Sequence, residues 1–287
     1  MPLDSIAEIL ASCSERNLAF WQVVLEADVE KRQVSAEASF EKMRATWRAM
    51  LDSVESYDGG LRSVSGLSGG DGELMRRYAA GGSALGGGYI SEVIATALCV
   101  GESNACMRKI VAAPTAGACG VLPAVLVPLY RRGEREEDIL RALYTAAGIG
   151  AVINSRASIS GAAGGCQAEI GSASAMAAGA LAQLRGGGPE QTANALAMAL
   201  KNLMGLICDP VAGLVEVPCV KRNVIGAVNA VSCADMALAG ITSRIPADEV
   251  IDCMGIVGER LPREFRETAR GGLAATPTGR AAWKQLK

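Results

Sequence analysis

The chain has 287 residues, a formal net charge of −2 and no histidine. This length allows a substantial buried core, and scattered basic residues in a nearly neutral chain offer no electrostatic footprint for nucleic acid. No apolar run approaches the roughly 20 residues that span a bilayer, and the N-terminus lacks the features of a signal peptide. We therefore expect a globular cytoplasmic protein that binds neither nucleic acid nor membrane.

The composition favours helices that pack closely together. Half of the residues are hydrophobic, yet only 4% are aromatic, and 34 are glycines. No regular alternation of strand and helix patterns is found, which argues against a Rossmann fold or a TIM barrel. The sequence predicts an all-α fold.

The N-terminal segment, residues 1–57, is predicted to form an amphipathic helical hairpin. Ser5 and Glu8 have the spacing of a capping box, and apolar residues follow at helical intervals. A second charged helix is expected within residues 28–55. We expect residues 58–287 to form the larger helical domain, in one continuous fold with the hairpin.

Residues 58–88 contain eleven glycines, which we interpret as too many for regular structure. The segment is either a long surface loop or a binding loop that lines a pocket. Beyond it the sequence predicts helices separated by short turns, and "GLVEVPCV" (213–220) is the best strand candidate. The predicted helices cover residues 89–109, 120–132, 136–153, 168–184, 189–206, 223–240 and 247–259.

Three of the turns combine glycine with hydroxyl, amide or thiol side chains. They are "AAPTAGACG" (112–120), "SISGAAGGCQAEIGS" (158–172) and "CDPVAGLVEVPCVKRN" (208–223). Gathered at one end of a helical bundle, these turns would form a polar site in an apolar scaffold.

Nine cysteines without an export signal argue against a disulfide framework. Cys166 and Cys219 are expected just before helices, where the positive helix end favours a thiolate, whereas Cys208 follows a helix C-terminus. A structural zinc site would need four ligands in close pairs, which the chain lacks. A four-iron cluster is larger, and three thiolates would leave one iron open. Spacing alone favours three buried or reactive cysteines over a cluster. We expect five others to be core residues: Cys13, Cys99, Cys106, Cys233 and Cys253.

Several of these stretches resemble the alpha chain of iron–sulfur-dependent L-serine dehydratase. They include "SGLSGGDG", "APTAGACG", "SISGAAGGCQAEIGSASAMAAG", "LKNLMGLICDPVAGLVEVPCVKRN" and "GGLAATPTG". The resemblance implies a lyase that converts L-serine into pyruvate and ammonia with a [4Fe–4S] cluster. It also implies that Cys166, Cys208 and Cys219 hold the cluster and that Cys119 does not.

The matching loops suggest substrate contacts as well. Serine contacts are expected from Thr115, Gly117, Ser158, Ser160 and Gly161, and support or carboxylate binding from Gln167, Arg222 and Asn223. Hydroxyls in turns often bond only to local backbone, and Asn223 could simply cap a helix. The general base is not identified by the sequence; the candidate side chains are Lys109, Lys221 and Glu169, and an iron-bound hydroxide is the alternative.

Since the chain has no histidine, the resemblance implies a separate beta chain that completes the site of an oligomeric enzyme. Three alternatives stay open. One is a pyridoxal-phosphate serine dehydratase with "GGSALGGG" (81–88) as its phosphate loop, although no strand–helix alternation supports it. The second is a cysteine desulfidase-like lyase on the same cluster. The third is a non-catalytic helical subunit whose cysteines are core or redox-sensing residues.

Overall fold

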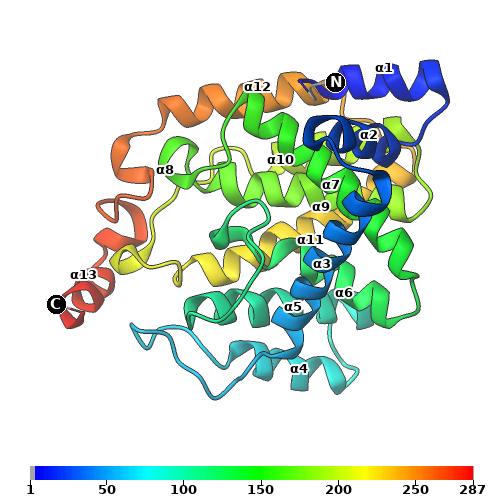
Figure 1. Cartoon of the computed structure of the whole chain (residues 1–287). Coiled ribbons are helices and arrows are strands. Elements are labelled where there is room, and N and C mark those ends of the chain that lie inside the picture. Colours follow the sequence, from blue (N-terminus) through cyan, green and yellow to red (C-terminus); the bar gives the residue numbers. More distant parts are fainter. Residues whose placement is uncertain (1–3, 287) are drawn as a thin grey trace.

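The computed structural model describes residues 4–286 and is built from helices (Figure 1). Thirteen α-helices lie within the described range, together with short 3-10 turns and one π-helical turn. No strand is present there; the single β-bridge joins Cys208 to Arg266. The predicted all-α fold is therefore confirmed for the described residues. None of these helices is long and apolar enough to cross a membrane.

The N-terminal segment forms three helices where the sequence predicted two. They are α1 (Ile6–Arg16), α2 (Phe20–Arg32) and α3 (Ala36–Glu55). The first two end at Asn17 and Gln33, both in the left-handed conformation, which turns the chain sharply. Ser5 caps α1 as predicted, with its hydroxyl accepting from the Glu8 N–H at 3.1 Å. The division into residues 1–57 and 58–287 stays a prediction.

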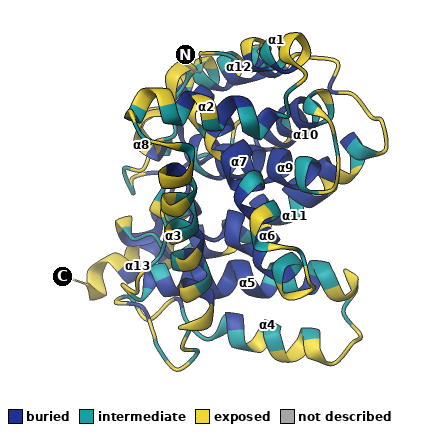
Figure 2. Cartoon of the chain, turned by 45° about the vertical axis from the view of Figure 1, so that its right-hand side comes forward, coloured by how far each residue is buried: buried dark blue, intermediate teal, exposed yellow. Residues whose placement is uncertain are grey.

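The centre of the molecule is α9 (Ser172–Leu184), of which eleven residues are buried (Figure 2). It packs against neighbours through small side chains. At Gly179 an added Cβ would lie 2.3 Å from Cδ1 of Ile149, so only glycine allows this approach to α7. Four other helices pack against α9: α6 (Val121–Arg131), α7 (Glu136–Arg156), α10 (Pro189–Asn202) and α11 (Cys219–Leu238). A fifth helix, α5 (Gly87–Ala105), packs against α6 and α11.

The prediction that residues 58–88 lack regular structure is wrong in part, because α4 (Asp71–Ala80) lies there. Its first turn is held by Glu102, a buried residue of α5. The carboxylate of Glu102 accepts from the N–H groups of Asp71 at 2.8 Å and Gly72 at 3.1 Å. A distant acidic side chain thus satisfies the free N–H groups that a local cap would otherwise serve.

The strand predicted at 213–220 is also absent. The segment folds back on itself, with the Val211 N–H donating to the Val217 carbonyl at 2.8 Å, and α11 begins at Cys219 rather than at Asn223. Without a neighbouring strand, its apolar alternation has nothing to pair with. The C-terminal part contains α12 (Ala247–Arg260) and α13 (Pro277–Gln285), the second of which was not predicted.

Candidate functional site

Cys166 lies in the irregular segment between α8 (Gly161–Gly164) and α9. Gly165 precedes it with a φ of +76°, and a π-helical turn follows over Gln167–Gly171. The Gln167 side chain is fully buried: its Oε1 accepts from Gly205 N–H at 2.7 Å and its Nε2 donates to the Met254 carbonyl at 3.1 Å. Gln167 therefore supports the Cys166 backbone, and its amide is already engaged by protein groups.

Cys208 is held by the C-terminal part of the chain. Its N–H donates to the Phe265 carbonyl at 2.8 Å, and its carbonyl accepts from the Glu267 N–H at 3.0 Å. The next residue, Asp209, accepts from the Leu273 N–H at 2.8 Å. At Gly272, with a φ of +57°, an added Cβ would lie 2.3 Å from Oδ2 of Asp209. The segment 265–273 therefore fixes the position of Cys208.

Cys219 is the first residue of α11, so its thiol lies at the positive end of a long helix. All three thiols are buried and act on one another. A hydrogen bond from the Cys208 thiol, aided by the Arg222 guanidinium, lowers the pKa of Cys166. The same bond raises the pKa of Cys208, while burial and the neighbouring Cys166 raise the pKa of Cys219 to about 12. The structure therefore brings these three cysteines together from three separate segments of the chain.

Glu169 lies beside the thiols. The Thr115 hydroxyl donates to Oε1 of Glu169 at 2.7 Å, and an added Cβ at Gly117 would lie 3.2 Å from the same oxygen. At Gly161 an added Cβ would lie 2.6 Å from Oε2 of Glu169 and 3.2 Å from Sγ of Cys208. Burial raises the pKa of Glu169, and the Thr115 bond opposes that shift. Three predicted substrate-contact residues thus surround one carboxyl group next to Cys208.

Arg222 and Asn223 hold the loops to α11. The Arg222 guanidinium donates to the Ile207 carbonyl at 2.8 Å and to Oδ1 of Asp209 at 2.9 Å. Asn223 lies in the second turn of α11 and is not its cap. Its Nδ2 donates to the carbonyls of Gly117 at 2.8 Å and Cys219 at 2.9 Å, and its Oδ1 accepts from Gly120 N–H at 2.8 Å. These two side chains fix the loops that carry Cys208 and Thr115.

Other predicted site residues have local or surface roles. The Ser158 hydroxyl accepts from the Ser160 N–H at 3.1 Å, as in an ordinary turn, and Ser160 itself is exposed. Lys221 pairs with Asp71 at the surface, with 2.6 Å between Nζ and Oδ2, and Lys109 is exposed in the turn after α5. Of the three base candidates, Glu169 is the one whose charge acts on all three thiols.

The sequence did not predict a role for two acidic residues, Asp209 and Glu216. Asp209 joins Arg222 to the C-terminal segment, and its only signal was its place directly after Cys208. Glu216 is buried and accepts from the hydroxyls of Ser63, at 2.6 Å, and Ser65. It therefore ties the glycine-rich segment to the turn that precedes Cys219.

Within residues 4–286 no group of three or more His, Cys, Asp or Glu side chains is arranged to hold a single metal ion. The three thiols are instead a donor set of soft ligands with a cation, Arg222, at their side. Soft thiolates of this kind suit an iron–sulfur cluster, which is larger than one ion.

Comparisons with known proteins identify the family of this chain. A family model described as "Serine dehydratase alpha chain" matches residues 15–274. "Probable L-serine dehydratase, alpha chain" of Bacillus subtilis is 47% identical over 98% of this chain and 94% of its own length. "L-serine dehydratase, alpha chain" of Peptoniphilus asaccharolyticus is 40% identical over 96% of both chains. "L-serine dehydratase TdcG" of Escherichia coli is 38% identical over 94% of this chain and 61% of its own length.

The match covers all three cysteine loops and nearly the whole helical fold. A relative that is 47% identical over almost the entire length shares both fold and family with this chain. The chain therefore belongs to the serine dehydratase alpha chain family.

Proposed function

We propose that this chain is the catalytic alpha chain of an iron–sulfur L-serine dehydratase, a lyase that converts L-serine into pyruvate and ammonia. Family membership supports the reaction and the substrate. The proposed cofactor is supported by three buried thiols that lie close together although they come from separate segments: Cys166, Cys208 and Cys219. No zinc-type pairing of cysteines accompanies them in the sequence.

Cys166, Cys208 and Cys219 would hold three irons of a [4Fe–4S] cluster and leave the fourth without a protein thiolate. When bound, the cluster supplies a Lewis acid that favours loss of the serine hydroxyl. Arg222 would offset negative charge on the sulfurs, since its guanidinium already hydrogen-bonds to Cys166. Asp209 keeps the guanidinium in place through its 2.9 Å ion pair.

Removal of the Cα proton needs a base close to the thiols. Glu169 suits this task by position: Thr115 orients one carboxylate oxygen, and the other lies over Gly161 beside Cys208. Because position 161 carries no side chain, the Glu169 carboxyl group can lie close to the backbone there and beside the Cys208 thiol. We propose that Glu169 accepts the Cα proton of L-serine.

A second chain is also proposed. Two of the relatives bear the name alpha chain, and the E. coli relative extends well beyond the region that this chain matches. The chain contains no histidine. We propose that a beta chain completes the enzyme and contributes to the site.

The substrate is tested by comparing L-serine with L-cysteine on the anaerobically purified alpha–beta complex. Pyruvate formed from L-serine at a higher kcat/KM than from L-cysteine is expected. A preference for L-cysteine, with release of sulfide, would favour the desulfidase alternative. Borohydride treatment is expected to leave activity unchanged, whereas a pyridoxal-phosphate enzyme would lose it.

A further inference from the structure

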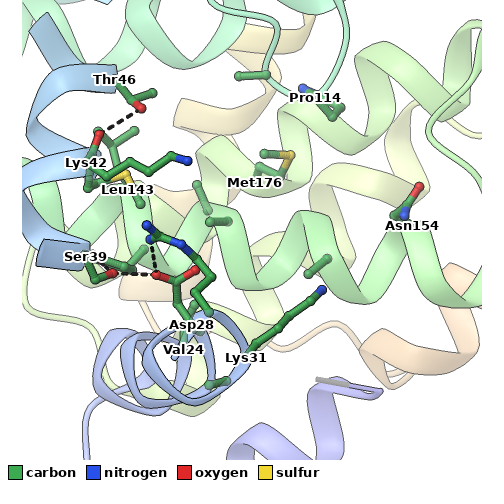
Figure 3. A pocket seen from close by; sticks show the side chains of 18 of the residues that line it. Val24, Asp28, Lys31, Ser39, Lys42, Thr46, Pro114, Leu143, Asn154 and Met176 are labelled. Atoms are coloured by element: carbon green, nitrogen blue, oxygen red, sulfur yellow. Dashed lines mark hydrogen bonds and ion pairs between the residues drawn. The ribbon is translucent and has the colours of Figure 1, made fainter. Parts of the chain in front are cut away.

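A cleft of about 1140 Å³ lies away from the cysteines, between α2, α3 and α7 (Figure 3). The loop of residues 111–114 forms one wall, and α6 and α9 contribute to its floor. Protein sites for small organic molecules commonly measure about 300–1,000 Å³. This cleft is of that order and far larger than serine requires.

The depth of the cleft is apolar. Its lining includes Leu122, Tyr144 and Met50, each 2% exposed, so the cleft reaches the hydrophobic core. Three of the lining residues are methionines, whose flexible side chains adapt to varied apolar shapes. On the open side, α7 presents Ala147 and Ala151, which are exposed and small. An apolar body can therefore enter without displacing a large side chain.

The cationic side chains at this cleft differ in whether an acidic side chain pairs with them. Lys31 and Lys42 both extend into it from α2 and α3 (Figure 3), and neither forms an ion pair with another described residue. Arg32 is already bound to Asp28, at 2.8 Å, and Asp28 also accepts from Ser39 Oγ at 2.5 Å. Asp4 and Glu30 also border the cleft. Lys31 and Lys42 are therefore the cations at this cleft that no ion pair with a described residue neutralises.

We propose that this cleft binds an organic anion with an apolar body, such as a carboxylate or sulfonate on an aliphatic or aromatic group. The anionic group pairs with Lys31 and Lys42, and the apolar body occupies the pocket above Leu143 and Met176. Burying that body against core side chains gives the affinity, and the lysines give the preference for anions.

Such a ligand would contact a loop that also reaches the cysteines. Ala112, Ala113 and Pro114 line the cleft, and the next residue, Thr115, donates to Glu169 at 2.7 Å. A ligand that moved this loop would therefore change the orientation of Glu169. The binding itself depends on neither the cluster nor serine, so it stands or falls separately from the proposed function.

The probe for this site is 8-anilinonaphthalene-1-sulfonate, an anion whose fluorescence rises in apolar surroundings. Saturable binding of one probe per chain, displaced by laurate, is expected for the purified protein without substrate. The double variant Lys31→Glu/Lys42→Glu should weaken probe binding at least about tenfold, because two side chains that attract the anionic probe are replaced by two that repel it. Ala151→Phe, which fills the cleft and leaves the lysines intact, should also weaken it.

The matched control is Arg48→Glu/Lys284→Glu, which makes the same charge change at exposed positions outside the cleft. It should bind the probe as the wild type does. Equal affinity in the Lys31/Lys42 variant and the wild type, or no saturable binding, would overturn the proposal. Displacement of the probe by the beta chain but not by laurate would do so as well, because the cleft would then be a protein interface.

Discussion

The Thr115 hydroxyl donates to Oε1 of Glu169 at 2.7 Å, joining residues 54 positions apart. This contact links the loop before α6 to the π-helical turn after Cys166. In our account it orients the carboxylate that takes the substrate proton.

Replacing Thr115 by alanine should therefore lower kcat while KM and iron content stay close to wild type. A hydrogen bond to a charged group contributes about 1.5–3 kcal/mol, so a loss of roughly tenfold or more is expected. Thr115→Ser keeps the hydroxyl and should retain most of the activity. Steady-state kinetics with iron analysis test this, and equal loss in both variants would contradict a role for the hydroxyl.

Gly161→Ala tests the space beside Cys208. The new Cβ would lie 2.6 Å from Oε2 of Glu169 and 3.2 Å from Sγ of Cys208, so one of them must move. Overpacking of this kind costs about 1–3 kcal/mol, and we expect both lower iron content and lower activity. Gly188→Ala is the control, because an added Cβ meets nothing within 4 Å there. An active, fully loaded Gly161→Ala enzyme would show that the site is more open than described.

Asn223 is expected to contribute strongly to stability. Its amide forms three hydrogen bonds, two of which join α11 to Gly117 and Gly120 while the third stays within α11, and the side chain is buried. Asn223→Ala should lower the free energy of unfolding by about 3 kcal/mol, since buried partners are left unsatisfied. Urea unfolding of the protein without cofactor measures this. Asn154→Ala, at an exposed position, should change it by less than about 0.5 kcal/mol.

Glu216 should control the mobility of the glycine-rich segment. It is the acceptor for Ser63 and Ser65, so Glu216→Ala releases that segment from the turn before Cys219. Faster amide hydrogen exchange is expected over residues 61–70, with little change in α9. The exposed Glu249 serves as the control position. Unchanged exchange over residues 61–70 in Glu216→Ala would mean that other contacts hold the segment.

Much of the fold follows from local sequence patterns. The predicted helix starts at residues 136, 189 and 247 agree with α7, α10 and α12, and Ser5 caps α1 as expected. By contrast, α4 was missed because its first turn is satisfied by Glu102, 31 positions from Asp71. The false strand at 213–220 had the right apolar alternation but no partner. Local propensity cannot supply either of these long-range facts.

In the candidate site, too, local sequence predicts some features, and long-range contacts determine the others. The candidate site was predicted in loops that combine glycine, threonine and cysteine. Three residues of these loops, Thr115, Gly117 and Gly161, lie around Glu169 in the structure. The part played by Asp209 could not be seen, because its partner Leu273 lies 64 positions away. Gln167 was expected to support the site or bind the carboxylate, but its buried bonds to Gly205 and Met254 could not be predicted, because they depend on tertiary packing.

The central claim is that Cys166, Cys208 and Cys219 hold a four-iron cluster. The most direct measurement is iron and acid-labile sulfide per chain after anaerobic purification, for the wild type, Cys219→Ser and Cys253→Ser. The prediction that Cys253 is a core residue is wrong, because its face of α12 is exposed. Since it also lies outside the site, it is the matched control. We predict about four of each per chain in the wild type and in Cys253→Ser, with most of both lost in Cys219→Ser. Full occupancy in Cys219→Ser, or no iron in the wild type, would contradict the account.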